Sequence, residues 1–134
     1  MQSPIPETVY TITDWYDGAR AGIADFGGSP HYYECQWDDD PDSDNNNTYL
    51  LTPINDYVFR LALEDWEIWQ RYDVASRAGN APPETHPALP EDRPRHEEIQ
   101  LLLDDSLRIV PNNAIRVIGE FEYSKGVVKW TVIV

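Results

Sequence analysis

RAGIADFGGSPHYYECQW, residues 20–37, is the clearest β-hairpin pattern in the chain. Its centre, residues 27–30, contains two glycines, which adopt positive φ without steric cost and so suit a tight reversal. In the second arm, Tyr33, Cys35 and Trp37 share one face, while Tyr32, Glu34 and Gln36 share the other. We expect the first face to be buried and the second to be partly exposed to solvent.

Further strands are predicted on both sides of this hairpin. Residues 8–13, TVYTIT, are rich in β-branched and aromatic side chains and predict an opening strand. Near the C-terminus, residues 114–123 and 127–134 flank Ser124-Lys125-Gly126, which predicts a second hairpin. The sequence therefore predicts about five strands.

Two helices are expected between the hairpins. Thr52-Pro53 suits the start of the first helix, with a hydroxyl at the N-cap and proline at the first helical position, although Asn55 is an alternative cap. Gly79-Asn80 suits its end. Its apolar stripe consists of Val58, Leu61, Ala62, Trp66, Trp69 and Tyr72, broadened by Phe59, Leu63 and Ile68.

A proline-rich connection separates the two helices. Residues 80–94 contain five prolines, which exclude a continuous helix or strand there. A second helix is expected from Pro94 to about Leu107, with Ile99, Leu102 and Leu103 facing inward. Together the elements predict one α+β domain over residues 1–134: a curled antiparallel sheet of about five strands, with two helices inserted between the third and fourth strands.

The chain is strongly acidic, with a formal net charge of -14 over 134 residues. The most concentrated acidic run, residues 38–47, is DDDPDSDNNN, which predicts a solvated loop. This charge disfavours nucleic acid and anionic membranes as direct ligands and favours a protein with a basic surface. With one cysteine, no export signal and no long apolar run, we expect a cytoplasmic protein that does not span the membrane.

The segment DWYDGARAG, residues 14–22, is the strongest candidate for a site on the first hairpin. Trp15 and Tyr16 can form an apolar platform, and the planar guanidinium of Arg20 can bind a carboxylate or phosphate. In the alternative interpretation Asp17-Gly18 simply makes a turn, Arg20 pairs with Asp14 or Asp17, and the aromatic rings fill the core. Both interpretations are open at this point.

The sequence supplies no metal, cofactor or catalytic motif. Asp40, Asp42 and Asp44 have the alternate spacing that begins a calcium loop, but Asn45 and Leu51 replace the glycine and glutamate that complete it. The three histidines have no ligand spacing typical of zinc, and the neighbours of Cys35 predict burial rather than reactivity. We therefore expect no catalytic residue, no metal and no cofactor.

Four short motifs resemble a family of small bacterial proteins without a known activity. They are DWYDGxRxGIA at residues 14–24, PHYY at 30–33, LEDWEIW at 63–69 and HPALPEDR at 86–93. The resemblance implies a cytosolic domain of bacterial or phage origin. It transfers no catalytic residue.

The leading functional hypothesis is a non-enzymatic inhibitor or adaptor, comparable to an immunity protein or a nucleic-acid mimic. Its predicted steering residues are Asp38, Asp39, Asp40, Asp42 and Asp44, and its predicted anchors are Trp15, Tyr16 and Arg20. The alternative is a small-ligand or enzymatic domain centred on Trp15, Tyr16, Arg20, His31 and Glu34. A structural subunit of a larger assembly is a third hypothesis.

Overall fold

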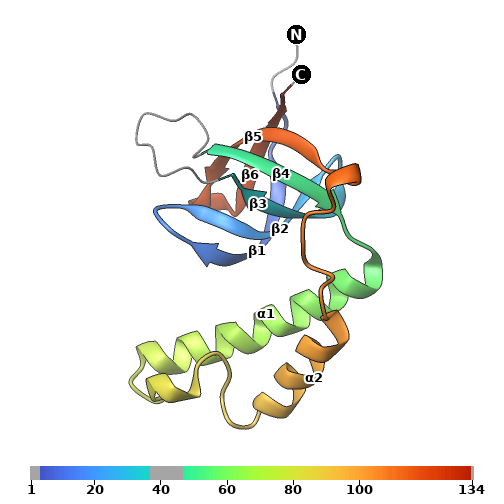
Figure 1. The fold of residues 1–134 in the computed structure, drawn as a ribbon. Coiled ribbons are helices and arrows are strands. Elements are labelled where there is room, and N and C mark those ends of the chain that lie inside the picture. Colours follow the sequence, from blue (N-terminus) through green and yellow to red (C-terminus); the bar gives the residue numbers. More distant parts are fainter. Residues whose placement is uncertain (1–3, 37–46, 134) are drawn as a thin grey trace. The chain divides into compact units, whose positions relative to one another are not determined.

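The computed structural model describes residues 4–36 and 47–133, which contain six strands and two α-helices (Figure 1). The strands are β1 (Glu7–Trp15), β2 (Ala19–Phe26), β3 (Ser29–Cys35), β4 (Thr48–Pro53), β5 (Ile115–Glu122) and β6 (Val127–Val132). The helices are α1 (Asp56–Arg77) and α2 (Arg93–Leu103). Each strand pairs antiparallel with the next, and β6 pairs with β1, so the sheet closes into a barrel. The predicted α+β class is confirmed.

The hairpin predicted over residues 20–37 is formed by β2 and β3. Phe26 pairs with Ser29, and Gly27 and Gly28 between them have φ angles of 61° and 81°. Within β3, Tyr33 is fully buried and Glu34 is exposed, as the alternation predicts. Trp37 lies outside the described residues.

Three features of the predicted sheet are wrong. The sheet has six strands rather than five, it is closed rather than curled and open, and the helices lie between β4 and β5 rather than between the third and fourth strands. The missed strand, β4, contains the Thr52-Pro53 pair that was expected to start a helix. The Thr52 hydroxyl oxygen instead accepts a hydrogen bond from the backbone N–H of Val110 at 3.0 Å. Helix α1 begins later, at Asp56, directly after the alternative cap Asn55.

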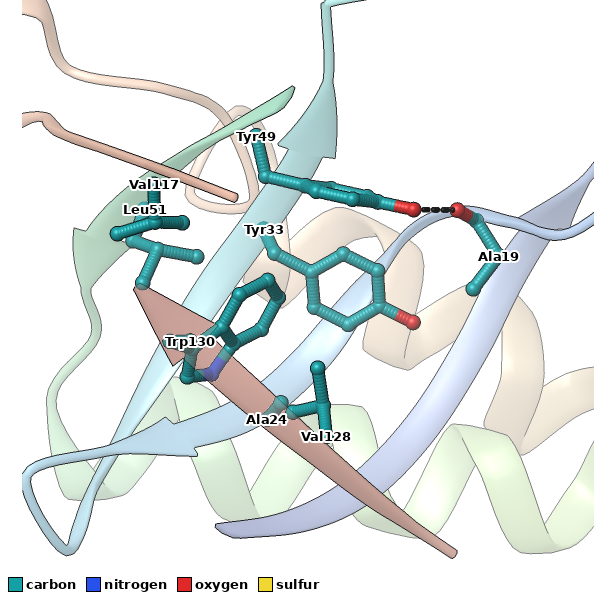
Figure 2. Packing of buried hydrophobic residues seen from close by; sticks show 8 residues of the cluster. All are labelled: Ala19, Ala24, Tyr33, Tyr49, Leu51, Val117, Val128 and Trp130. Carbon is teal, nitrogen blue, oxygen red and sulfur yellow. Dashed lines mark hydrogen bonds between the residues drawn. The ribbon is translucent and has the colours of Figure 1, made fainter. Parts of the chain in front are cut away.

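Large aromatic side chains fill the barrel where two strands carry glycine. Gly22 on β2 pairs with Tyr33 on β3, and Gly119 on β5 pairs with Trp130 on β6. The rings of Tyr33 and Trp130 lie beside each other in the core, with centroids 5.9 Å apart, and Tyr49 packs on both (Figure 2). Because glycine has no side chain, each pair gives a bulky ring the space that a second side chain would occupy.

The chain divides into two compact units. Residues 56–107 form a helical unit, and the residues on either side of it form the barrel unit. Among the described residues, no helix is both long enough and apolar enough to cross a membrane. The division leaves the prediction of a single domain over residues 1–134 untested.

Helix α1 in the helical unit buries part of the expected stripe, whereas Trp66 and Trp69 are only partly buried and stack on each other with ring centroids 5.0 Å apart. Val58, Leu61, Ala62, Ile68 and Tyr72 are buried. The helix ends at Arg77, close to the predicted stop at Gly79, whose φ is 77°.

Helix α2 is shorter than predicted and buries fewer of its side chains. It buries Ile99 and Leu103, but Leu102 is exposed, contrary to the prediction, and the helix ends at Leu103 instead of about Leu107. The proline-rich connection before it contains one short 3-10 turn, Pro83–Thr85.

Ion pairs join the two helices. Arg95 on α2 donates two hydrogen bonds to Glu64 on α1, at 2.6 and 2.7 Å, and also bonds Glu98. Arg71 on α1 contacts both carboxylate oxygens of Asp92 at 2.9 and 3.0 Å. Such two-point contacts fix orientation as well as charge. Glu64 and Asp92 therefore hold the two helices together.

The two carboxyl groups make the stability of the helical unit depend on pH. Hydrogen bonds from Arg95 and Arg71 hold the pKa of Glu64 and that of Asp92 below their usual values. A carboxyl group with a lowered pKa in the folded state stabilises the fold at a pH above its unfolded pKa, and loses that effect as pH falls through the folded pKa. We therefore expect a progressive loss of stability below about pH 5, where carboxyl groups with ordinary pKa values begin to bind protons.

Urea denaturation between pH 7 and pH 3, followed by circular dichroism, checks this dependence. An Arg71→Gln, Arg95→Gln double variant should lose less stability on acidification than the wild type. Arg60→Gln is the matched control, because it removes only a highly exposed pair with Asp56 within one helix. Equal acid sensitivity of the wild type and the double variant would contradict the expectation.

Candidate functional site

Three connections of the barrel lie at the same end. Successive strands of the barrel run in opposite directions, so the connections β1–β2, β3–β4 and β5–β6 all leave from one rim. The backbone N–H of Gln36 donates to the carbonyl of Thr48 at 2.8 Å, where the chain leaves β3 and enters β4. The β5–β6 connection is the short turn η4 (Tyr123–Lys125). We call this end of the barrel the turn rim.

The β1–β2 turn carries two of the predicted anchors. Tyr16 donates its backbone N–H to the carbonyl of Gly18 at 3.0 Å. Asp17 has a φ of 54° and Gly18 a φ of 134°, so Asp17-Gly18 makes the reversal, as one of the two interpretations proposed. The side chains of Trp15 and Tyr16 are 56% and 67% exposed, so they do not fill the core. Both rings lie on the surface of the turn.

The third predicted anchor, Arg20, holds the turn from within. Its Nε donates to the carbonyl of Tyr16 at 2.6 Å, and its Nη2 donates to the carbonyl of Asp17 at 3.1 Å. Its Nη1 lies 3.4 Å from Sγ of Cys35 on β3. Arg20 therefore bonds main-chain carbonyls of the turn, where one of the two interpretations had placed it against the carboxylate of Asp14 or Asp17. Its observed contacts position the turn that presents Trp15 and Tyr16.

Tyr123 belongs to the same group of residues but was not predicted. Its ring contacts Trp15 in a T-shaped arrangement, with centroids 5.0 Å apart, and stacks on Phe121 at 5.6 Å. Its hydroxyl oxygen accepts the backbone N–H of Ala19 at 2.8 Å. An aromatic residue directly before the turn residues Ser124-Lys125-Gly126 was the available signal. This signal placed Tyr123 on the turn rim only when the order of the strands was known.

Two side chains, one buried and one partly buried, lie beneath the rim. The Tyr49 hydroxyl donates to the carbonyl of Ala19 at 2.6 Å (Figure 2). Burial raises the pKa of Tyr49 above its usual range, and the neighbouring Arg20 guanidinium partly opposes this. Cys35 packs partly buried against the core, as its neighbours predicted. The hydrogen bonds that Ala19 makes to Tyr49 and Tyr123 connect the turn to β4 and η4.

Replacing Arg20 tests its positioning role. Arg20→Ala removes donors to two turn carbonyls, so we expect the free energy of unfolding to fall by about 1–2 kcal/mol and the turn to lose order. Arg20→Lys should recover little of this loss, because an ammonium group lacks the planar fork. Chemical denaturation gives the stability, and backbone amide NMR gives the order of residues 15–19. Unchanged stability in both variants would show that the turn holds without Arg20.

The five residues of the alternative ligand site do not converge in the structure. His31 is buried at the other end of β3, where it pairs with Ala24, and its Nδ1 lies 2.8 Å from the carbonyl oxygen of Ser29. Cys35, which contacts Arg20, is four residues further along the strand, roughly 13 Å away at the usual rise of an extended chain. Glu34 is exposed and accepts a hydrogen bond from Tyr32.

The predicted steering residues, Asp38, Asp39, Asp40, Asp42 and Asp44, lie outside the described residues. Within residues 4–36 and 47–133, no group of three or more histidine, cysteine or acidic side chains has a geometry that would hold a metal. A shallow, mainly apolar hollow of about 660 Å³ lies on the helical unit, beside Val74 and Leu89. It contains none of the predicted site residues.

The chain matched no family model, no curated protein and no solved structure. The resemblance to small bacterial proteins therefore rests on the four sequence motifs alone.

Proposed function

We propose that the protein is an acidic, non-enzymatic binding module that acts as an inhibitor or adaptor for a protein with a basic surface. The observation that carries the proposal is the gathering of three exposed aromatic side chains, Trp15, Tyr16 and Tyr123, on the turn rim. The described chain stops at Gln36, two residues before the acidic run, and resumes at Asn47, the last residue of the run, and both positions adjoin strand ends of the same rim. One end of the barrel thus combines aromatic side chains with the attachment points of the most acidic segment.

Affinity and encounter rate are assigned to different residues. Binding energy at protein interfaces comes mostly from a few large side chains, tryptophan and tyrosine in particular, that are buried when the partner docks. Trp15, Tyr16 and Tyr123 are the candidates for this role. Charged groups mainly raise the rate of encounter, and the aspartates of residues 38–44 are the candidates for steering. Arg20 contributes by holding the turn that presents the first two rings.

The β1–β2 turn is also suited to binding a partner without catalysing a reaction. Its groups are held by main-chain hydrogen bonds, and the packing of Tyr123 on Trp15 and Phe121 orders the rings before a partner arrives. Such preorganisation lowers the entropy lost on association. The aromatic rim therefore suits a protein surface.

Affinity capture from the native host's lysate tests the proposal. Immobilised wild-type protein should capture a basic protein at low salt and release it at high salt, as identified by mass spectrometry. Trp15→Ala should weaken this capture severely. Tyr57→Ala is the matched control, because Tyr57 is an aromatic side chain of the helical unit with similar exposure, 57%.

The control decides how the capture is interpreted. Capture that is lost in Trp15→Ala and kept in Tyr57→Ala supports binding through the turn rim. Capture that both variants retain would refute the assignment to the rim. No specific partner at either salt concentration would refute the binding module itself.

A further inference from the structure

The ring of Trp15 is held on one side and open to solvent elsewhere. Its T-shaped contact with Tyr123 has an interplanar angle of 62°, and an edge contact of this kind covers at most one face of the indole. More than half of the side chain remains exposed, and the adjacent Tyr16 is exposed as well. The rim therefore offers an aromatic face in a fixed orientation to an incoming group.

Acidic residues adjoin the two rings in sequence. Asp14 and Asp17, on either side of the two rings in sequence, are both exposed. Among the cations of this rim, Arg20 directs N–H groups at the turn carbonyls, Lys125 lies 3.5 Å from the carboxylate of Glu122, and Arg116 donates to the side-chain oxygen of Gln36 at 3.3 Å. Both residues that adjoin the two rings in sequence are therefore exposed acids, which favours a positively charged group over an anion.

We propose that the exposed face of Trp15, beside Tyr123, binds a guanidinium or ammonium side chain, and that the exposed acids Asp14 and Asp17 strengthen the negative potential of the turn. The face of an aromatic ring attracts a cation, tryptophan most strongly, and a neighbouring carboxylate adds to this attraction. The inference rests on the proposed function, because it identifies the feature of the partner that the rim recognises. Arginine fits better than lysine, since its planar group also stacks on the ring.

A matched pair of small probes tests the site on the full chain. N-acetyl-arginine methylamide and N-acetyl-citrulline methylamide have nearly the same shape and differ in charge. Each is titrated into the protein while the tryptophan indole N–H signals are followed by NMR, with Trp15 assigned from its loss in Trp15→Leu. N-acetyl-lysine methylamide shows whether an ammonium group is also accepted.

We expect the arginine probe to shift the Trp15 signal and to bind roughly three- to tenfold more tightly than the citrulline probe, the range that one or two exposed cation–aromatic contacts supply. Trp15→Leu keeps an apolar side chain at the position but removes the aromatic face. The preference for the charged probe should therefore disappear in this variant, as seen at the backbone amides of residues 14–18. Tyr57→Leu should keep the preference.

Equal binding of both probes, or a preference that survives in Trp15→Leu, would overturn the inference. These outcomes are separate from the fate of the proposed function. A basic protein captured through Trp15, without any preference for the arginine probe, would leave the binding module standing and refute cation recognition. A clear preference at Trp15 supports cation recognition even if lysate capture finds no partner.

Discussion

Replacing Gly22 by alanine is expected to lower the free energy of unfolding by about 3–5 kcal/mol, from overpacking and a lost buried hydrogen bond. A Cβ atom at this position would lie 2.1 Å from the carbonyl oxygen of Thr11 and 2.6 Å from the hydroxyl of Tyr33. That hydroxyl crosses Gly22 to donate to the Thr11 carbonyl at 2.9 Å. Because small domains are stable by only about 5–15 kcal/mol, this loss could unfold much of the population.

A glycine in a turn supplies the control for Gly22. A Cβ atom at Gly27 would meet no atom within 4 Å, but the φ of 61° disfavours alanine. We expect Gly27→Ala to cost only about 1–2 kcal/mol, the price of a left-handed conformation. Urea denaturation of both variants and the wild type, followed by tryptophan fluorescence, gives the comparison. If Gly22→Ala were as stable as Gly27→Ala, the close approach of β1, β2 and β3 would not be essential to the barrel.

Neutralising the acidic run should slow association with the partner. With Asp38, Asp39, Asp40, Asp42 and Asp44 all replaced by asparagine, we expect the on-rate at low salt to fall roughly tenfold or more, within the range attributed to electrostatic steering. The off-rate should change little, because the anchors remain. The difference between variant and wild type should shrink as salt rises, since screening weakens the steering of both. Stopped-flow binding to the captured partner measures these rates.

The matched control removes the same amount of charge from other positions. Glu67, Glu84, Glu91, Glu97 and Glu120 are exposed, and their replacement by glutamine also neutralises five acids. If steering comes from the acidic run, this control should slow association less than the aspartate variant does. An on-rate and salt dependence that stay unchanged in the aspartate variant would refute steering by the run. Equal slowing in both variants would assign the effect to net charge.

The sequence predicted the locally determined elements of the fold well. The β2–β3 hairpin, the C-terminal hairpin and the apolar stripe of α1 follow from turn residues and periodicity within short segments. Strand β4 was missed because Thr52-Pro53 has the local chemistry of a helix start. In the structure the Thr52 hydroxyl accepts a hydrogen bond from the backbone N–H of Val110, 58 positions away. No local pattern contains such a partner.

Closure of the barrel and the composition of the rim were likewise outside the reach of local patterns. The β1–β6 pairing consists of Glu7 with Val128 and Thr8 with Val127, a seam of two residue pairs. Trp15 and Tyr16 were predicted as anchors from the turn alone. Tyr123 could be added to these anchors only from the structure, in which its ring lies against Trp15. Arg20 shows the same limit of local patterns. Its residue type suggested that it binds a ligand, but its side chain donates hydrogen bonds to main-chain carbonyls.

The insertion of the helical unit between β4 and β5 has a consequence for the order of folding. The β2–β3 and β5–β6 hairpins join neighbours in sequence, but β4 and β5 must meet across the whole of residues 56–107. Closing a long flexible loop costs entropy, and contacts between distant residues slow folding. A helical unit that collapses on its own contacts would shorten the effective distance between the two strands. We therefore expect mutations that weaken the α1–α2 contacts to slow the assembly of the barrel, even though they lie on none of its strands.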